Sequence, residues 1–298
     1  MTSPNHLITQ SLRSYRIGII GCGTMGQALI KGLLDHGVPA SRLCVADASA
    51  AARRIVARRF GIKAVARNRD AVRGAGLILL AVKPQQMAGV VDELAAALTR
   101  SVLVISIAAG MTLRWLEKHL PGLPVVRVMP NLPATVGCGF AAIAAGRRAT
   151  TRHRAVAMAL FDAMGIAVEL PERHFDAVTA VSGSGPAYVF YLVQIWERAA
   201  RALGLPASAA ALAIRQTLEG SVRLLQADGA AAAELIRQVA SKRGTTEAAL
   251  SVLARRRVGT HFTEALQAAA RRSRELSADR YQVPKAGTGT RYRLKGRR

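Results

Sequence analysis

The chain has 298 residues, of which 51% are hydrophobic and 20% are charged. This composition excludes a disordered protein, and the length allows two ordinary domains with a sizeable buried core. The formal net charge is +24, but no nucleic-acid recognition motif accompanies the basic excess, so nucleic acid is not the partner that we expect.

The three cysteines, Cys22, Cys44 and Cys138, form no CxxC pair and show no metal-ligand spacing. We therefore expect free thiols, as in a cytoplasmic protein, and no metal site. Since no run of about 18 apolar residues occurs, we expect no membrane-spanning segment. Residues 1–14 lack the apolar core of a signal peptide and are predicted to form a flexible N-terminus.

The first predicted element is a buried strand over Arg16–Ile20, followed by a glycine-rich loop. Gly21, Gly23 and Gly26 give the spacing G-x-G-x-x-G, and the apolar residues after them recur at helical intervals up to Gly37. In such a loop the first glycine allows a tight turn and the second lets the backbone approach a pyrophosphate. The third lets helix and strand pack closely. Strand, loop and helix in this order predict a dinucleotide-binding site.

A second strand, "RLCVAD", is predicted to end at Asp47. An acidic side chain about 20 residues after the last glycine bonds the ribose hydroxyls of the adenosine and disfavours a 2′-phosphate. The alternative is that Asp47 only caps a helix that begins near Ala48. Arg53 and Arg54 lie one turn further on, where they could offset the repulsion of a 2′-phosphate.

Further buried strands are predicted at Leu77–Val82, Val102–Ile107 and Val125–Met129, with helical patterns between them. This alternation is typical of an α/β fold, the doubly wound and mainly parallel sheet of Rossmann-like domains. Ligands bind at the carboxyl ends of such strands. We assign residues 15–171 to this dinucleotide-binding domain.

From about Pro171 on, the pattern predicts helices only. After a long helix that begins near Pro186, the predicted helices are Ala207–Ala227, Ala231–Val239, Thr245–Leu253 and Thr263–Leu276. Many are apolar on more than one face, and such helices must be buried. We therefore expect an all-helical dimerisation domain over residues 172–278, followed by a disordered basic tail over 279–298.

Several segments together resemble one family, the pyrroline-5-carboxylate reductases. They are "GCGTMGQALIKGLL", "AVKPQ", "SIAAG", "RVMPNLPATVGCG", "AVSGSGPAYVF" and "AARRSRELS". The resemblance implies a Rossmann domain and a helical domain that interlocks two subunits, with larger rings of dimers in part of the family. The implied reaction is the last step of proline biosynthesis, in which NADPH or NADH reduces the cyclic imine L-1-pyrroline-5-carboxylate to L-proline.

The resemblance also implies roles for single residues. Asn68 matches a position near the 2′-phosphate of the adenosine ribose, while Ala109 and Asn131 match positions towards the nicotinamide. With Asp47 added from its spacing, the cofactor-binding set is Gly21, Cys22, Gly23, Thr24, Met25, Gly26, Asp47, Asn68, Ala81, Val82, Lys83, Ala109, Asn131 and Gln238.

The substrate set implied by the resemblance is Ser241, Gly244, Thr245 and Thr246. In the family, helix-start amides hold the substrate carboxylate, and the hydroxyl at the position of Thr246, the catalytic residue, bonds the ring nitrogen. The family reads Ser-Pro-Gly-Gly-Thr-Thr where this chain has "SKRGTT", so Lys242 and Arg243 replace proline and glycine. If the loop keeps its path, Arg243 takes a left-handed conformation at a cost of about 1–2 kcal/mol.

Alternatives to the resemblance stay open at this point. Without it, Gly244–Glu247 would be interpreted only as a helix cap with an acidic first turn. The altered loop also allows a dinucleotide-binding relative that acts on another imine or serves as a dimeric regulatory protein. A third hypothesis is a basic protein associated with nucleic acid. For cofactor choice, Asp47 favours NADH while Asn68 leaves room for NADPH, so we expect both to serve.

Overall fold

The computed structural model describes residues 12–95, 97–99, 101–227, 229 and 231–277, which form two compact units. The first unit holds the chain up to Thr179 and again from Arg272 on, and the second unit is Ala180–Arg271. The predicted basic tail over 279–298 lies outside the described residues. So does most of the predicted flexible N-terminus, of which residues 12–14 are helical and Leu12 is buried.

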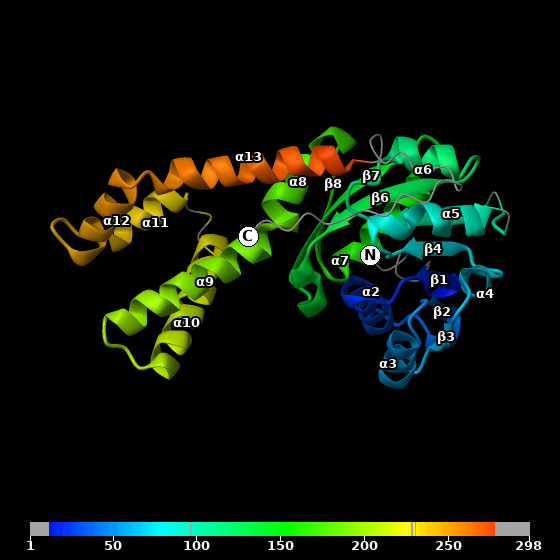
Figure 1. Ribbon diagram of the computed structural model, residues 1–298, viewed down its shortest axis with the longest axis horizontal. Coiled ribbons are helices and arrows are strands. Elements are labelled where there is room, and N and C mark those ends of the chain that lie inside the picture. Colours follow the sequence, from blue (N-terminus) through cyan, green and yellow to red (C-terminus); the bar gives the residue numbers. More distant parts are fainter. Residues whose placement is uncertain (1–11, 96, 100, 228, 230, 278–298) are drawn as a thin grey trace, which may run out of the picture. The chain divides into compact units, whose positions relative to one another are not determined.

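The first unit is built on one eight-stranded sheet (Figure 1). Its strands are β1 (Ile17–Ile20), β2 (Leu43–Ala46), β3 (Lys63–Val65), β4 (Leu77–Leu80), β5 (Leu103–Ser106), β6 (Val125–Pro130), β7 (Gly139–Ala145) and β8 (Gly165–Glu169). They lie in the order β3-β2-β1-β4-β5-β6-β7-β8. Neighbouring strands from β3 to β6 are parallel, β7 is antiparallel to β6, and β8 is parallel to β7.

The predicted mainly parallel, doubly wound sheet is therefore confirmed, but three of its strands were not predicted. β3 has three residues, β7 reads "GFAAIAA" and β8 reads "GIAVE". Short or alanine-rich segments of this kind carry little of the β-branched and aromatic character that identifies a strand.

Helices cover both faces of the sheet. They are α2 (Thr24–Asp35), α3 (Ala50–Phe60), α4 (Asn68–Val72), α5 (Met87–Ala95), α6 (Leu113–His119), α7 (Thr151–Asp162) and α8 (Phe175–Val178). Buried side chains of α2, α3 and α7 share one core with Ile17 and Ile19, whereas those of α4, α5 and α6 share a second core with Ile20. Successive strand residues point to opposite faces, so both faces of β1 are apolar and both are covered.

Short helical turns join these elements. The 3₁₀ turns are η1 (Ala40–Arg42), η2 (Pro84–Gln86), η3 (Leu132–Val136) and η4 (Glu172–His174), and η5 (Thr179–Gly183) is a π-helix. η5 spans the boundary between the two units, which falls after Thr179.

The second unit is helical, as predicted, within its described residues. Its helices are α9 (Gly185–Ala202), α10 (Ala207–Ala227), α11 (Ala232–Val239), α12 (Thr245–Arg255) and α13 (Val258–Leu276), whose last turn belongs to the first unit. Large apolar side chains stay exposed on these helices, among them Phe190, Tyr191, Leu212 and Val239, each 60% exposed or more. An exposed apolar surface of this kind marks a site of association.

Candidate active site

Three glycines shape the loop between β1 and α2. Gly21 has a φ of +97°, and a Cβ on it would lie 2.7 Å from the carbonyl oxygen of Ala81. A Cβ on Gly26 would lie 2.3 Å from the carbonyl oxygen of Gly21, whereas a Cβ on Gly23 would meet nothing within 4 Å. The loop thus has the tight turn, the close helix packing and the open approach that a bound pyrophosphate requires.

The start of α2 presents amides to this open approach. Gly23 is the N-cap of α2 and has no side chain to accept a hydrogen bond. The first N–H groups of a helix have no partner within it and carry the positive end of its dipole. The amides of Thr24 and Met25 are therefore suited to a phosphate group, and the loop fits the dinucleotide that the sequence implies.

The side chain of Asp47 is fixed beside the same loop. Its Oδ2 accepts a hydrogen bond from the amide of Cys22 at 2.9 Å, and its Oδ1 accepts one from the amide of Ser49 at 2.8 Å. Ser49 is the N-cap of α3, and its hydroxyl accepts from the amide of Ala52. The N-cap of α3 is thus Ser49, and the Asp47 carboxylate is held by two backbone amides, one of them in the glycine-rich loop. A hydrogen bond from Asp47 to the ribose stays a prediction.

Cys22 contributes to the loop through its backbone. Burial, followed by the charge of Asp47 and a hydrogen bond to it, raises the pKa of the Cys22 thiol to about 12. The thiol is thus protonated at physiological pH and is a poor nucleophile.

Among the described residues, no group of three His, Cys, Asp or Glu side chains could hold a metal ion.

The carboxyl end of β4 forms the next part of the site. The amide of Ala81 donates to the carbonyl oxygen of Ile20 at 2.8 Å. Val82 is half-buried beside it, and Lys83 is exposed. Ala81 and Val82 therefore lie against the glycine-rich loop, which is the position required of residues that line a cofactor bound there.

Asn68 is the first residue of α4, and its amide is already engaged. Its Nδ2 donates to Oε2 of Glu93, on α5, at 2.6 Å. This hydrogen bond ties α4 to α5 and leaves the carbonyl oxygen and one N–H of the side-chain amide for another partner.

Ala109 and Asn131 follow the neighbouring strands β5 and β6. Gly110, with a φ of +77°, has no room for a Cβ, which would lie 2.5 Å from the carbonyl oxygen of Leu276. The loop that carries Ala109 therefore packs closely against the end of α13. Asn131 accepts a hydrogen bond at Oδ1 from the amide of Phe140 at 2.9 Å, which orients its side chain.

The remaining predicted residues lie in the second unit. Gln238 is exposed near the end of α11, and Ser241, Gly244, Thr245 and Thr246 form the following loop and the start of α12. The other predicted cofactor residues thus follow the carboxyl ends of the parallel strands in the first unit, and the predicted substrate residues belong to the second unit.

The loop before α12 contains a left-handed residue. Arg243 has a φ of +59°, and its amide donates to Oε2 of Glu247. The amide of Gly244 donates to the carbonyl oxygen of Ser241 at 3.0 Å, and a Cβ on Gly244 would lie 2.3 Å from Oγ of Ser241. From the sequence, Glu247 was predicted only to place a favourable charge in the first turn of the helix, and its hydrogen bond to the loop was not predicted.

The start of α12 resembles the start of α2. Gly244 is its N-cap, again without a side-chain hydrogen bond, so the first amides of α12 can donate hydrogen bonds to an anion. The side chains of Lys242 and Arg243 are exposed beside these amides and add positive charge. Thr246 is half-buried in an otherwise mainly apolar hollow of about 310 Å³, which is lined by Ser221, Leu224, Leu225, Ala232, Leu235, Ile236, Val239, Thr246 and Leu250.

Two family models match the chain. Residues 172–276 match pyrroline-5-carboxylate reductase dimerisation, and residues 16–110 match the NADP oxidoreductase model described as coenzyme F420-dependent. The match to the first model supports the prediction that this part of the chain serves dimerisation. The match to the second agrees with a nicotinamide dinucleotide as cofactor.

The chain is similar to whole proteins as well. It is 41% identical to pyrroline-5-carboxylate reductase of Pseudomonas aeruginosa over 88% of this chain and 97% of that protein. The structure of the Coxiella burnetii enzyme is 33% identical, with a TM-score of 0.81 over 89% of this chain and 99% of that one.

The structure of Plasmodium falciparum pyrroline carboxylate reductase with NADP bound is also similar, at 26% identity and a TM-score of 0.82. It covers 89% of this chain and 99% of that one. These similarities cover both units of the chain, at up to 41% identity. The chain belongs to the pyrroline-5-carboxylate reductase family.

Proposed function

We propose that the chain reduces L-1-pyrroline-5-carboxylate to L-proline with NADPH or NADH. The observation that carries the proposal is the 41% identity to a pyrroline-5-carboxylate reductase over nearly the whole length of that protein. Bound reduced nicotinamide supplies the hydride for the imine carbon. A protonated imine is already electrophilic, so the chain has to align the ring and neutralise its carboxylate, and no strong acid is required.

The first unit holds the cofactor in this proposal. The amides of Thr24 and Met25 receive the pyrophosphate, and Asp47 accepts hydrogen bonds from the ribose. Ala81 and Val82 line the dinucleotide, and Ala109 and Asn131 lie towards the nicotinamide. This assignment is supported by the open space above Gly23 and by the carboxylate that is fixed beside the loop.

The start of α12 holds the substrate carboxylate. The amides of Thr245 and Thr246 point at the anion, and the hydroxyl of Thr246 bonds the ring nitrogen. This assignment is supported by the N-cap without a side chain and by the half-buried position of Thr246 beside apolar side chains. Lys242 and Arg243 raise the local positive potential, and both side chains are exposed.

We further propose that the chain is a homodimer through residues 172–278, with residues 15–171 as the cofactor domain. The exposed apolar side chains of α9 to α12 support a partner on the helical unit. Light scattering should give twice the chain mass of 31.6 kDa. We propose no larger ring.

In the part of the chain that the structure describes, no helix is long and apolar enough to cross a bilayer. The cytoplasmic location stays a prediction.

The test of the reaction is the oxidation of NADPH and of NADH with L-1-pyrroline-5-carboxylate, with L-proline identified as the product. We expect turnover with both cofactors and less than a tenfold preference. A protein that binds either dinucleotide but produces no proline would instead support the hypothesis of a repurposed relative with an altered loop.

A further inference from the structure

We propose that Glu172 and Asp176 are positioning residues, which hold the loop between β5 and α6 in place for the nicotinamide of the cofactor. This loop, residues 107–112, carries Ala109. The inference rests on the proposed function and deepens it, because the sequence assigned Ala109 to the cofactor site without indicating what holds its loop. The partners of the two carboxylates are Arg127 and Ser273, and neither belongs to the predicted site.

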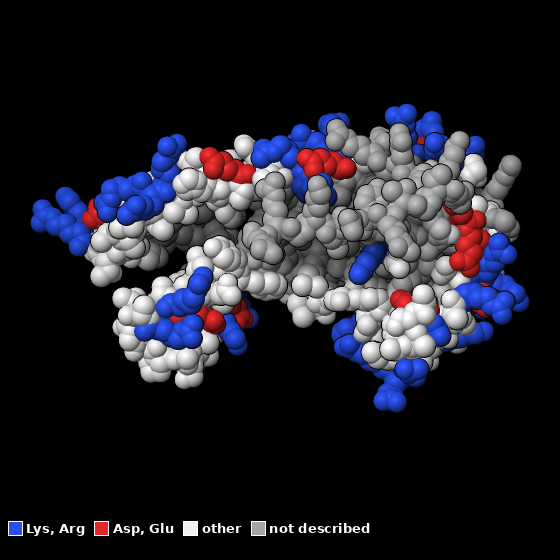
Figure 2. Space-filling view, in the orientation of Figure 1, with Lys and Arg blue, Asp and Glu red and all other residues white. Residues whose placement is uncertain are grey.

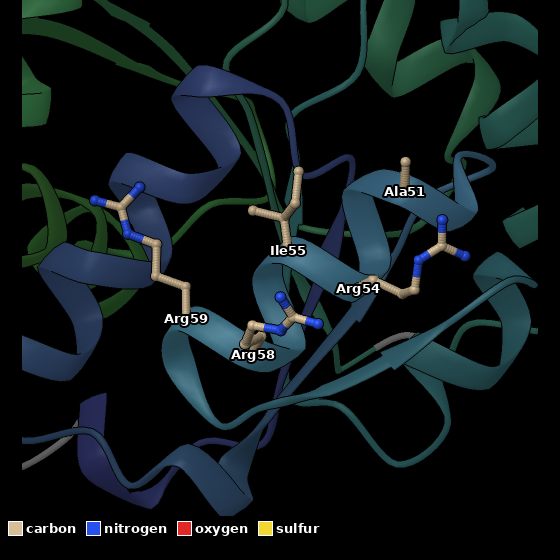
Figure 3. Close-up of a pocket in the computed structure, with 5 residues that line it drawn as sticks. All are labelled: Ala51, Arg54, Ile55, Arg58 and Arg59. Carbon is tan, nitrogen blue, oxygen red and sulfur yellow. The ribbon is translucent and has the colours of Figure 1, made fainter.

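The burial of Arg127 sets it apart. Among the described residues it is the one arginine or lysine that is buried, at 4% exposure. Other basic side chains are seen on the surface (Figure 2), and three arginines of α3 line a shallow exposed hollow with Ala51 and Ile55 (Figure 3). Moving a charge out of water costs free energy that a partner charge offsets only in part, so a buried ion pair often adds little net stability. The pair of Arg127 therefore has its main effect on geometry.

Glu172 joins three elements through one oxygen. Its Oε1 accepts a hydrogen bond from Nη1 of Arg127, on β6, at 2.7 Å, and another from the amide of Leu113 at 2.7 Å. Leu113 is the first residue of α6, where the amides have no partner within the helix, and Glu172 supplies one. The guanidinium carbon of Arg127 also lies 4.7 Å from the ring centroid of Phe175, on α8. The end of the loop is thus fixed to β6 and α8.

The start and the middle of the loop are held as well. Ser106, which pairs with Arg127 in the sheet, accepts a hydrogen bond at Oγ from the amide of Ala108 at 3.4 Å. Gly110 lies so close to Leu276 that a Cβ on it would be 2.5 Å from the carbonyl oxygen of Leu276. Leu276 is the last residue of α13, so the position of the loop depends on where this helix ends.

Asp176 holds the last turn of α13. Its Oδ1 accepts a hydrogen bond from Oγ of Ser273 at 2.6 Å, and Ser273 is 6% exposed. Both residues belong to the first unit, as the loop does. Asp176 follows Phe175 on α8, so this helix links the hydrogen bond to the Arg127–Glu172 pair. A fixed loop matters for hydride transfer because a displacement of about 1 Å can lower the rate about a hundredfold.

Hydrogen exchange of backbone amides, measured by mass spectrometry on the full chain without cofactor, tests whether the loop is held. We expect Ser273→Ala to speed exchange in residues 107–113 about tenfold and to leave the glycine-rich loop, residues 21–26, within threefold. Ser273→Thr keeps the hydroxyl and should stay within threefold throughout. Glu172→Gln keeps an acceptor but loses the charge opposite Arg127, and it should speed exchange in the same segment about three- to tenfold.

The matched control is Ser277→Ala, the same change one turn further on. The Ser277 hydroxyl donates to the carbonyl oxygen of Ser273 and not to Asp176, so we expect exchange in residues 107–113 to stay within threefold.

Steady-state kinetics test whether the held loop serves the nicotinamide. In Ser273→Ala we expect kcat with NADPH and the imine to fall about tenfold. The dissociation constant of NADPH, from fluorescence titration, should change less than threefold, because the proposed pyrophosphate and ribose contacts lie at residues 21–26 and at Asp47. Ser273→Thr should restore kcat to within threefold of the unaltered protein.

Unchanged exchange of residues 107–113 in both Ser273→Ala and Glu172→Gln would overturn the proposal, and so would faster exchange with an unchanged kcat. An equal effect in Ser277→Ala would also overturn it, because it would show a general loosening at the end of α13. Exchange needs neither cofactor nor imine. If the unaltered protein produced no proline, the proposed reaction would fail, and exchange would still decide whether the two carboxylates hold the loop.

Discussion

The two loops that precede α2 and α12 have the same proposed task, the binding of an anion, and they contain different residues. Each leads into a helix whose N-cap is glycine, Gly23 in one and Gly244 in the other, and neither cap has a side-chain hydrogen bond. Each also needs a left-handed residue before the helix. In the first loop this is Gly21, with a φ of +97°, and in the second it is Arg243, with a φ of +59°.

This difference shows that the left-handed position before such a helix can hold a residue other than glycine only where a side chain has room. A Cβ on Gly21 would meet the carbonyl oxygen of Ala81, so the first loop excludes any side chain. The second loop has an exposed side chain at its left-handed position, and the hydrogen bond from the amide of Arg243 to Glu247 holds the backbone there. The conformation of the first loop therefore requires glycine, because a side chain would not fit at Gly21. The second loop instead contains a left-handed arginine whose amide is held by a hydrogen bond to Glu247.

The largest expected effect comes from filling the first loop. Gly26→Ala places a Cβ 2.3 Å from the carbonyl oxygen of Gly21, a backbone atom that cannot rotate away. We expect cofactor affinity to fall about a hundredfold, or about 2.7 kcal/mol, as measured by fluorescence titration with NADPH. The control is Gly89→Ala, because a Cβ on this glycine of α5 meets nothing within 4 Å. Equal affinities in both variants would contradict the role of packing in this loop.

The next effect tests the second loop through its chemistry. Thr246→Ala removes the hydroxyl proposed to bond the ring nitrogen, and we expect turnover to fall about ten- to a thousandfold. Cofactor affinity should stay nearly unchanged, which separates this variant from Gly26→Ala. Steady-state kinetics with the imine measure the first quantity and fluorescence titration the second. Normal turnover would remove Thr246 from the mechanism.

A smaller change is expected where Asp47 touches the first loop. Asp47→Ser removes a carboxylate that disfavours a 2′-phosphate and accepts two backbone amides. We expect the ratio of kcat/KM with NADPH to that with NADH to rise about tenfold, or about 1.4 kcal/mol. We also expect the free energy of unfolding to fall by about 1 kcal/mol. An unchanged ratio of the two specificity constants would leave Asp47 with a structural role alone.

The smallest effect tests the strain in the second loop. Arg243→Gly relieves the left-handed side chain but adds freedom to the unfolded chain, so we expect a net gain in stability of up to about 1 kcal/mol. Thermal unfolding measures it, and KM for the imine should stay within a few fold. Arg257→Gly is the matched control, because Arg257 has a φ of +53° outside this loop.

Both glycine variants should gain similar stability, and Arg257→Gly should leave KM for the imine unchanged. A large loss of turnover in Arg243→Gly alone would mean that its side chain binds substrate. A large gain would mean that the natural loop impairs the reaction.

Most of the first unit could be predicted from the sequence, because its central strands are continuous apolar runs and its glycines follow a known spacing. β3, β7 and β8 were missed since they are short or rich in alanine. The start of α13 was placed at Thr263, whereas the helix begins at Val258. Amphipathic patterns mark the middle of a helix more clearly than its end.

The candidate site was predictable in its residues and less so in its contacts. The sequence predicted Asp47 either near the ribose or as a helix cap. The structure shows Ser49 as the N-cap of α3, and Asp47 accepts the amides of Cys22 and Ser49. For Arg243 the prediction was conditional: a left-handed conformation was expected only if the loop kept its path, since arginine rarely adopts a positive φ. The left-handed conformation is accompanied by the hydrogen bond from the Arg243 amide to Glu247, four residues later, which no local preference of arginine indicates.

The central claim is that the start of α12 binds the substrate carboxylate as the start of α2 binds the pyrophosphate. It is tested most directly by comparing L-1-pyrroline-5-carboxylate with 1-pyrroline, the same cyclic imine without the carboxylate, in NADPH oxidation by the full chain. We predict that kcat/KM falls at least about a hundredfold for 1-pyrroline, which corresponds to about 2.7 kcal/mol. Equal kcat/KM values for the two imines would contradict the account.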